Sequence, residues 1–119
     1  MEDTIFTKII NRELPATIQY EDDEFIAFND IHPNAPVHVL VVPKKPYQTL
    51  EEVELSDTAF MGRLLQVCRT VAKKMGIADN YRLGMNVGKD LQAVPHIHVH
   101  IVGGWKSLSK VKYNTFSQE

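Results

Sequence analysis

The segment PHIHVHIVGG, residues 95–104, carries three histidines at alternate positions: His96, His98 and His100. Successive side chains of a β-strand point to opposite faces, so this spacing places all three imidazoles on one face. The residues between them are aliphatic, and their face is expected to pack in the hydrophobic core. The histidine face is not ordinary core, because each buried imidazole needs hydrogen-bond partners. The segment therefore predicts a strand with one core face and one polar face that needs a chemical explanation.

The elements around this segment are predicted from apolar patterning and from turn residues. Strands are expected where β-branched and other apolar residues cluster, over 17–23, 24–30, 36–43, 81–88 and 96–104. A short helix is predicted over 5–11 with Thr4 as its cap, and a long helix begins near Ser56 and ends at Gly76. The sequence thus predicts an α+β domain with an antiparallel sheet of about five strands, a short N-terminal helix and one long helix.

Length and composition exclude several classes of function. A chain of 119 residues is long enough for one domain with a single core. A net charge of −2 argues against a nucleic-acid partner or an anionic membrane surface, and the apolar run VLVVP is too short to span a bilayer. The N-terminal segment shows no targeting signal, and the single cysteine, Cys68, permits no internal disulfide. A cytoplasmic setting is therefore expected.

Three interpretations of the histidine face compete. A solvated strand would more usually carry lysine, glutamate or threonine. A metal site is disfavoured, because the outer histidines lie roughly 13 Å apart at Cα and one zinc ion with bonds of about 2.1 Å cannot reach all three. No cysteine or glutamate stands at a metal-motif spacing, so no metal and no cofactor are expected. Phosphate chemistry remains, because a neutral imidazole is a nucleophile at neutral pH, and the central His98 is the expected nucleophile.

Three blocks of the chain resemble the histidine triad (HIT) family of nucleotide hydrolases and transferases. HIHVHIVGG is similar to its His-x-His-x-His signature, and the blocks are TIFTKIINRELPA, AFNDIHPNAPVHVLVVPKK and NVGKDLQAVPHIHVHIVGG. They cover most of residues 4–104 of a single HIT domain expected over 1–119, whereas the tail 105–119 matches no pattern and its role stays open. The Gly103-Gly104 ending is most similar to the Hint branch, the purine nucleoside phosphoramidases.

The resemblance implies a HIT-like fold, a homodimer and a two-step hydrolysis. His98 would attack the α-phosphorus and form a nucleotidyl-histidine, which water would then hydrolyse. His100 would contact the phosphate, and His96 and His38 would tune or orient the nucleophile. The implied substrates are purine nucleoside 5′-phosphoramidates, AMP–amine conjugates, together with acyl- or aminoacyl-AMP. A dinucleoside polyphosphate hydrolase and a nucleotide-binding or partner-binding HIT module with weak catalysis remain as alternatives.

The resemblance also implies a nucleotide-binding site upstream of the triad. Asp30 would bind the ribose hydroxyls, as a carboxylate does when it accepts hydrogen bonds from a diol. The side chains that would wall the purine are apolar: Phe6, Ile9, Phe28 and Ile31. Plain core packing is an equal interpretation for Phe6, Ile9 and Phe28, and Asp30 is alternatively a turn residue.

The loop before the triad departs from the family pattern. Relatives carry Gly-Gln-Ser/Thr-Val, where this chain has Leu91, Gln92, Ala93 and Val94, and the loop that opens at Asn86 is one residue shorter. Ala93 lacks the hydroxyl that donates near the phosphate, which costs roughly 1–3 kcal/mol of transition-state binding. The resemblance nevertheless implies that Asn86 and residues 91–94 of this loop lie at the nucleotide, and the backbone amides of the run Gln92 to Val94 can still serve a phosphate.

Overall fold

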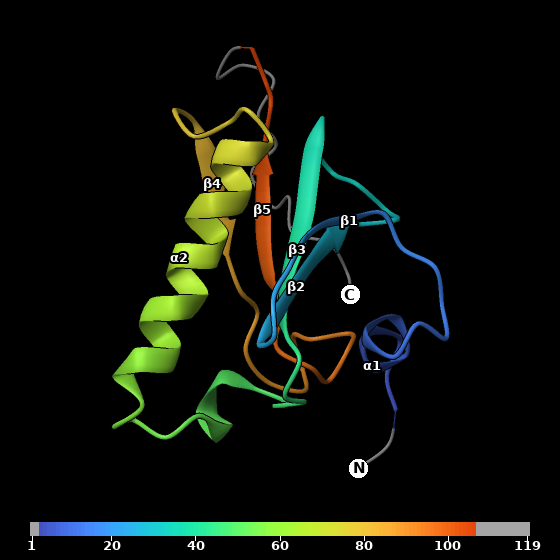
Figure 1. Cartoon of the computed structure of the whole chain (residues 1–119), viewed down its shortest axis with the longest axis vertical. Coiled ribbons are helices and arrows are strands. Elements are labelled where there is room, and N and C mark those ends of the chain that lie inside the picture. The colour runs from blue at the N-terminus through green and yellow to red at the C-terminus, as the bar shows by residue number, and fades with distance from the viewer. Residues whose placement is uncertain (1–2, 107–119) are drawn as a thin grey trace.

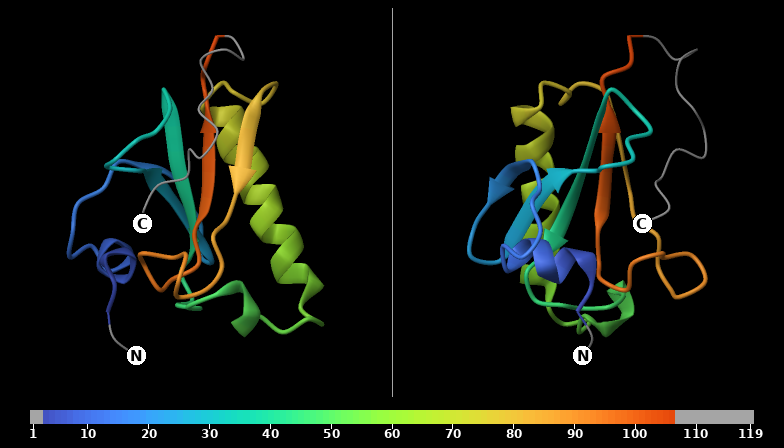
Figure 2. Two further views of the ribbon diagram at one scale, coloured as in Figure 1. Left: turned by 180° about the vertical axis from the view of Figure 1, so that it is seen from behind. Right: turned by 90° about the vertical axis from the view of Figure 1, so that its right-hand side faces the viewer.

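The computed structural model describes residues 3–106, which form a five-stranded antiparallel sheet with a helix on each face (Figures 1 and 2). The strands, in their order across the sheet, are β1 (Ile18–Glu21), β2 (Phe25–Asn29), β3 (Val37–Pro43), β5 (Val99–Gly103) and β4 (Tyr81–Gly84). The helices are α1 (Ile5–Ile10), the 3₁₀ turn η1 (Leu50–Glu52) and α2 (Thr58–Lys74). The predicted fold class is confirmed.

Both α-helices begin at capped positions. The Thr4 hydroxyl accepts hydrogen bonds from the backbone of Phe6 and of Thr7, and the Thr7 hydroxyl accepts in turn from the Thr4 N–H. The Asp57 carboxylate caps α2 by accepting from the Phe60 N–H at 3.1 Å. Gly76 then follows the helix with φ 74°, a conformation that favours glycine. The helix ends are therefore fixed locally, as the sequence predicts.

Alternation along the strands divides the interior into two clusters. One lies between the sheet and α2, and it is made of aliphatic and aromatic residues with Cys68. The other lies on the α1 side of the sheet and contains Phe6, Ile9, Ile26, Phe28, Leu40, Val42 and Val94. Among residues 3–106, no helix is long and apolar enough to cross a membrane.

All five strands are shorter than the sequence pattern indicates, and β4 and β5 differ most from their predicted ranges. β4 ends at Gly84 rather than at residue 88, and β5 begins at Val99 rather than at His96. The backbone of residues 96–98 has other partners, because the Ile97 N–H donates to the Tyr47 carbonyl at 2.9 Å instead of to the neighbouring strand. The faces nevertheless follow the predicted alternation, since Ile97 and Val99 pack in the α2-side cluster.

Candidate functional site

The strand register brings a fourth histidine to the triad. In the β3–β5 ladder Leu40 pairs with His100, so His38, two residues before Leu40, lies diagonally across from His100 on the same face. The ring centroids of His38 and His100 are 5.2 Å apart, and those of His98 and His100 are 5.1 Å apart. All four side chains are at most 4% exposed, so the solvated-strand interpretation is wrong.

His98 is oriented by the backbone of the residue two positions before it. Its Nδ1 lies 2.7 Å from the His96 carbonyl oxygen. A carbonyl oxygen only accepts hydrogen bonds, so Nδ1 carries a proton and donates it. A neutral imidazole has one ring proton, and the lone pair of His98 is therefore on Nε2. The Phe6 ring lies edge-on to His98 with the centroids 5.0 Å apart.

His96 has an anchoring contact. Its Nε2–H donates to the carbonyl of Pro43 at 2.7 Å, which ties the segment before β5 to the end of β3. Burial lowers the pKa of His96, although the Pro43 carbonyl opposes this by favouring the protonated ring. His96 thus positions His98 in two ways. Its side chain fixes the backbone of this segment to Pro43, and its carbonyl accepts the hydrogen bond from His98.

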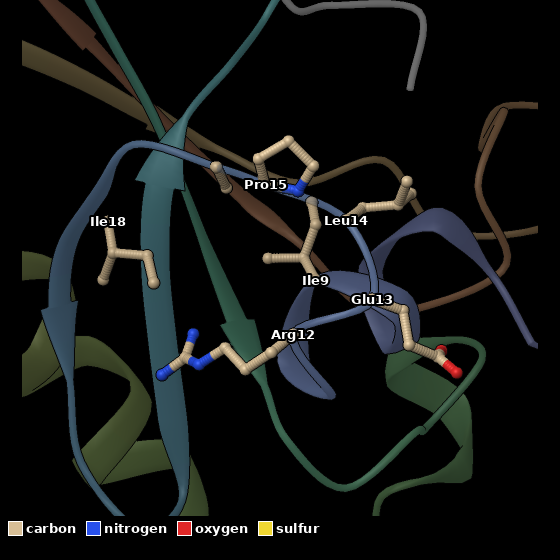
Figure 3. Close-up of a pocket in the computed structure, with 7 residues that line it drawn as sticks. Ile9, Arg12, Glu13, Leu14, Pro15 and Ile18 are labelled. Atoms are coloured by element: carbon tan, nitrogen blue, oxygen red, sulfur yellow. The ribbon is translucent and has the colours of Figure 1, made fainter.

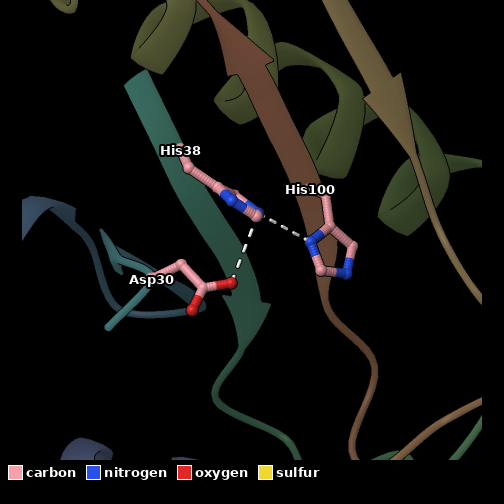
Figure 4. A group of neighbouring side chains, drawn as sticks. All are labelled: Asp30, His38 and His100. Carbon is pink, nitrogen blue, oxygen red and sulfur yellow. Dashed lines mark hydrogen bonds and ion pairs between the residues drawn. The ribbon is translucent and has the colours of Figure 1, made fainter. Parts of the chain in front are cut away.

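His38 and His100 form a buried pair beside Asp30 (Figure 4). Nε2 of His38 lies 3.0 Å from Nδ1 of His100 and 3.3 Å from Oδ2 of Asp30. On the other side of the His38 ring, the Asn34 N–H donates to Nδ1 at 3.0 Å. Burial lowers the pKa of His38, and burial together with the nearby His98 and His38 rings, which disfavour a further positive charge, lowers the pKa of His100 to about 3. Both rings are neutral at physiological pH.

Asp30 lies in the site and also shapes the turn that follows β2. Its Oδ1 accepts from the His32 N–H at 2.8 Å, as in an Asx turn, and the side chain is 5% exposed. The turn interpretation thus holds for this residue, whose Oδ2 also faces His38, and its binding of ribose hydroxyls stays a prediction. Its neighbour Ile31, one of the predicted purine walls, is 76% exposed.

The three other predicted wall residues are buried and form part of the α1-side cluster. Phe6 is 1%, Phe28 3% and Ile9 8% exposed, and the two phenylalanine rings contact each other at 5.6 Å. Ile9 also borders an open pocket of about 380 Å³ below the end of α1 (Figure 3). No pattern in the sequence marks the pocket's other walls, which are Arg12, Glu13, Leu14, Pro15, Ala16 and Ile18.

The loop before the triad is braced by the side chain of Gln92. Its Oε1 accepts from the Gly88 N–H at 2.8 Å, and its Nε2 donates to the carbonyls of Gln48 and Val94 at 3.0 and 3.1 Å. The side-chain amide of Gln92 therefore stabilises the loop. Any contact of Gln92 with a nucleotide would be made by its backbone N–H. Ala93 is exposed.

The other loop residues predicted for the site differ in how deeply they are buried. Val94 packs in the cluster with Phe6, at the base of the histidine face. Leu91 is 67% exposed, and Asn86 is partly exposed on the opposite limb of the loop. Only Val94 of this group is thus built into the wall beside the triad.

A family model for the HIT domain matches residues 11–107. The chain belongs to the HIT domain family. It is 52% identical over 104 residues to an uncharacterized HIT-like protein from Synechocystis, covering 87% of this chain and 91% of that protein. It is 47% identical over 104 residues to the 14 kDa zinc-binding protein of Zea mays, covering 85% and 81%. The predicted family is confirmed, whereas the Hint branch stays a prediction.

Solved HIT structures share the fold at similar coverage. A HIT family hydrolase from Clostridium thermocellum has a TM-score of 0.83 at 42% identity, with 89% of this chain and 94% of that chain covered. A HIT family hydrolase from Legionella pneumophila has a TM-score of 0.82 at 38% identity, with 87% and 95% covered. The histidine triad nucleotide-binding protein ST2152 of Sulfolobus tokodaii has a TM-score of 0.72 at 33% identity, with 87% and 70% covered.

The name of the maize relative raises the question whether this HIT chain holds zinc. Within residues 3–106, potential ligand atoms of Asp30, His38 and His100 all lie within 4.8 Å of one another. A tetrahedral zinc ion with bonds of about 2.1 Å separates its ligand atoms by roughly 3.4 Å, close to the 3.3 and 3.0 Å distances measured from His38 Nε2. Spacing alone would therefore admit an ion.

The protonation of His38 opposes that ion. Its Nδ1 accepts from Asn34, so the ring proton of neutral His38 sits on Nε2, the atom that faces Asp30 and His100. A metal ligand needs a lone pair at that atom. The donor set of this HIT domain therefore does not fit a zinc ion without loss of the Asn34 hydrogen bond.

Proposed function

We propose that this HIT domain hydrolyses the P–N bond of purine nucleoside 5′-phosphoramidates, and acyl- and aminoacyl-AMP by the same route. The observation that carries the proposal is the state of His98. Its Nδ1–H is held by the His96 carbonyl, which leaves a lone pair on Nε2 next to the ring of His100. The hydrolase and nucleotide-binding names of related HIT structures support the same reaction class.

The reaction proceeds in two displacements at the α-phosphorus. Nε2 of His98 forms a bond to phosphorus as the P–N bond of the substrate breaks, and the amine leaves with a proton taken from solvent water. A water molecule then attacks the same phosphorus and gives up a proton to solvent, the P–Nε2 bond breaks with its electron pair returning to Nε2, and the nucleoside monophosphate departs. The His96 carbonyl accepts a hydrogen bond from Nδ1–H throughout, and so stabilises the positive charge that develops on the His98 ring.

The nucleotide contacts belong to the same proposal. The purine lies against Phe6, Phe28 and Ile9, and it covers the exposed Ile31. Asp30 accepts hydrogen bonds from the ribose hydroxyls next to His38. A crystal soaked with AMP tests these placements together, and a ribose remote from Asp30 would contradict them.

A rapid-quench mass spectrum of the wild-type chain with an AMP–amine conjugate tests the nucleophile. We expect a labile AMP adduct on His98, and we expect none in His98→Ala. His32→Ala is the matched control, because it removes an exposed imidazole and keeps the backbone N–H that donates to Asp30. An adduct on another residue, or equal turnover by His98→Ala and the wild type, would overturn the assignment. Ap3A and Ap4A in the same assay test the dinucleoside polyphosphate alternative.

A HIT module that binds nucleotides but turns them over slowly is the second candidate. It is favoured by the loop, where Gln92 is committed to bracing the backbone and the exposed Ala93 carries no hydroxyl. Calorimetric binding of AMP without measurable hydrolysis of any of these substrates would favour this candidate over the enzyme.

We also propose that the chain forms a homodimer. Strand β4 is at an edge of the sheet, and its Leu83 side chain is 40% exposed. An edge strand presents backbone groups that can pair with another chain, and the exposed Leu83 adds an apolar contact to this surface. Light scattering coupled to gel filtration gives the mass directly, and a monomer at micromolar concentration would contradict this proposal.

A further inference from the structure

His38 is held at both ring nitrogens, and the two contacts together decide where its proton lies. The Asn34 N–H points at Nδ1 with the nitrogens 3.0 Å apart. A peptide N–H can only donate, so Nδ1 must offer a lone pair. His38 is neutral because burial lowers its pKa, and a neutral ring has one proton. That proton is therefore on Nε2.

The same reasoning passes from His38 to His100. Nδ1 of His100 lies 3.0 Å from Nε2 of His38, which carries a proton. Two N–H groups cannot face each other at that distance, so Nδ1 of His100 accepts. The low pKa of His100 keeps its ring neutral, and its single proton is on Nε2. Figure 4 shows this second nitrogen on the side of the ring away from His38.

We propose that the turn formed by residues 30–34 is a tautomer lock, which acts through His38 to make Nε2 of His100 a hydrogen-bond donor. The Asp30 carboxylate holds the turn by accepting from the His32 N–H at 2.8 Å, and the turn aims the Asn34 N–H at His38. Asn34 and His38 are positioning residues in this account. The role of His100 toward a phosphoryl oxygen rests on the proposed function, whereas the lock itself does not.

The lock explains how adjacent histidines acquire different chemistry. The His96 carbonyl places the proton of His98 on Nδ1, so that Nε2 is a nucleophile. The Asn34 amide, through His38, places the proton of His100 on Nε2, which makes that atom a donor. One backbone acceptor and one backbone donor thus set opposite tautomers on two rings whose centroids are 5.1 Å apart. A donor at His100 stabilises the negative charge on a phosphoryl oxygen, which a second lone pair would repel.

The tautomers can be measured by NMR on the whole 15N-labelled chain without nucleotide, from the chemical shifts of the histidine ring nitrogens. We expect the Nδ1 signals of His38 and His100 to be those of unprotonated nitrogen and their Nε2 signals to be those of N–H, with the reverse pattern for His98. Replacement of each histidine by glutamine in turn assigns the signals. A protonated Nδ1 on either His38 or His100 at neutral pH would overturn the lock.

Two substitutions at one position separate the peptide N–H from the side chain. Asn34→Pro removes the N–H, and Asn34→Ala keeps it as the matched control. We expect Asn34→Pro to give mixed tautomers at His38 and His100, and to lower kcat roughly tenfold to a hundredfold with a smaller change in KM, because the donor acts mainly in the transition state. Asn34→Ala should keep the wild-type tautomers. If the proline variant does not fold, an ester linkage in place of the Asn34 amide makes the same deletion.

A titration with Zn²⁺ alone gives a readout that is independent of activity. The wild type should not bind zinc through His38, whereas Asn34→Pro should gain binding that Asp30→Asn removes again. Wild-type tautomers in a folded Asn34→Pro variant, or zinc at His38 Nε2 in the wild type, would refute the lock. Confirmed tautomers without phosphoramidate turnover would leave the lock intact and refute the proposed function.

Discussion

The two faces of the sheet are equally buried but differ in what they can do. The α2-side cluster has an apolar buried core, and its Cys68 is inert because burial raises the pKa of the thiol to about 12. On the α1 side, four histidines and Asp30 are at most 5% exposed. Burial therefore does not distinguish an inert face from a reactive one. The difference is whether hydrogen bonds assign a proton to a particular ring nitrogen.

The same strands build both faces because their side chains alternate. Val39 and Val41 of β3 face α2, while His38 and Leu40 face α1. A substitution of a residue that faces α2 should therefore change mainly the free energy of unfolding. A substitution of a residue that faces α1 should change mainly the kinetics of the reaction. The predictions below test this division.

The largest effect is expected from His98→Ala, which removes the proposed nucleophile. Turnover of an AMP–amine conjugate should fall roughly 10³- to 10⁵-fold. Val71→Ala on the α2 side is the counterpart, and it should lower the free energy of unfolding by about 2 kcal/mol without changing kcat. Steady-state kinetics and urea titration of both variants measure the two quantities. A kcat loss in Val71→Ala comparable to that of His98→Ala would abolish the distinction between the faces.

Phe6 belongs to both the packing and the site, and Phe6→Ala should report both. The ring is 1% exposed and contacts Phe28 and His98, so its loss should cost about 3–5 kcal/mol of stability and raise KM. Phe60→Ala is the matched control, because that ring is 2% exposed and contacts Phe25 on the other face. Similar unfolding energies with a raised KM only in Phe6→Ala are expected. An unchanged KM in a folded Phe6→Ala variant would exclude Phe6 from the purine wall.

Local patterns predicted the faces, the Thr4 cap and the family, because each depends on residues close in sequence. Alternation placed His96, His98 and His100 together, and Thr4 begins α1 as expected. The start of β5 was not predictable in this way. It depends on the Ile97 N–H, whose acceptor is the carbonyl of a residue 50 positions earlier in the chain, Tyr47.

The contacts within the site were the least predictable part. The sequence indicated that His38 belongs with the triad, but its contact with His100 follows from a β3–β5 register that no local pattern contains. Likewise, Gln92 was expected at the nucleotide, whereas its side chain braces the loop through Gln48. Partners separated by 44 and 62 positions are set by the packed fold.

Acid should weaken the α1 side selectively. The pKa of His100 is held at about 3, whereas an unfolded histidine has a pKa of about 6.5. Between these values the unfolded chain binds more protons, so the free energy of unfolding falls as pH falls, by up to about 1.4 kcal/mol per pH unit. Burial lowers the pKa values of His38 and His96 in the same direction.

Urea titrations at pH 6.5 and pH 5 measure this dependence. His100→Gln removes one of these titrating groups. Between pH 6.5 and pH 5 its free energy of unfolding should therefore fall by about 2 kcal/mol less than that of the wild type. Val71→Ala should have a lower free energy of unfolding than the wild type, with the same dependence on pH. Equal slopes for the wild type and His100→Gln would show that His100 is not held neutral by the fold.

The smallest expected effect comes from the two helix caps, which lie on opposite faces. Thr4→Ala leaves the backbone N–H groups of Phe6 and Thr7 without this acceptor, and Asp57→Ala leaves that of Phe60. Each substitution should therefore cost about 1 kcal/mol of unfolding free energy. Only α1 carries Phe6, whose ring meets His98. Loosening the first turn of α1 should therefore raise KM several-fold, whereas loosening α2 should leave KM unchanged.

Steady-state kinetics without urea, where both variants are folded, measure the change in KM separately from the change in stability. A raised KM in Asp57→Ala would mean that the faces communicate through the sheet, because no side chain of the α2-side cluster is proposed to contact the nucleotide.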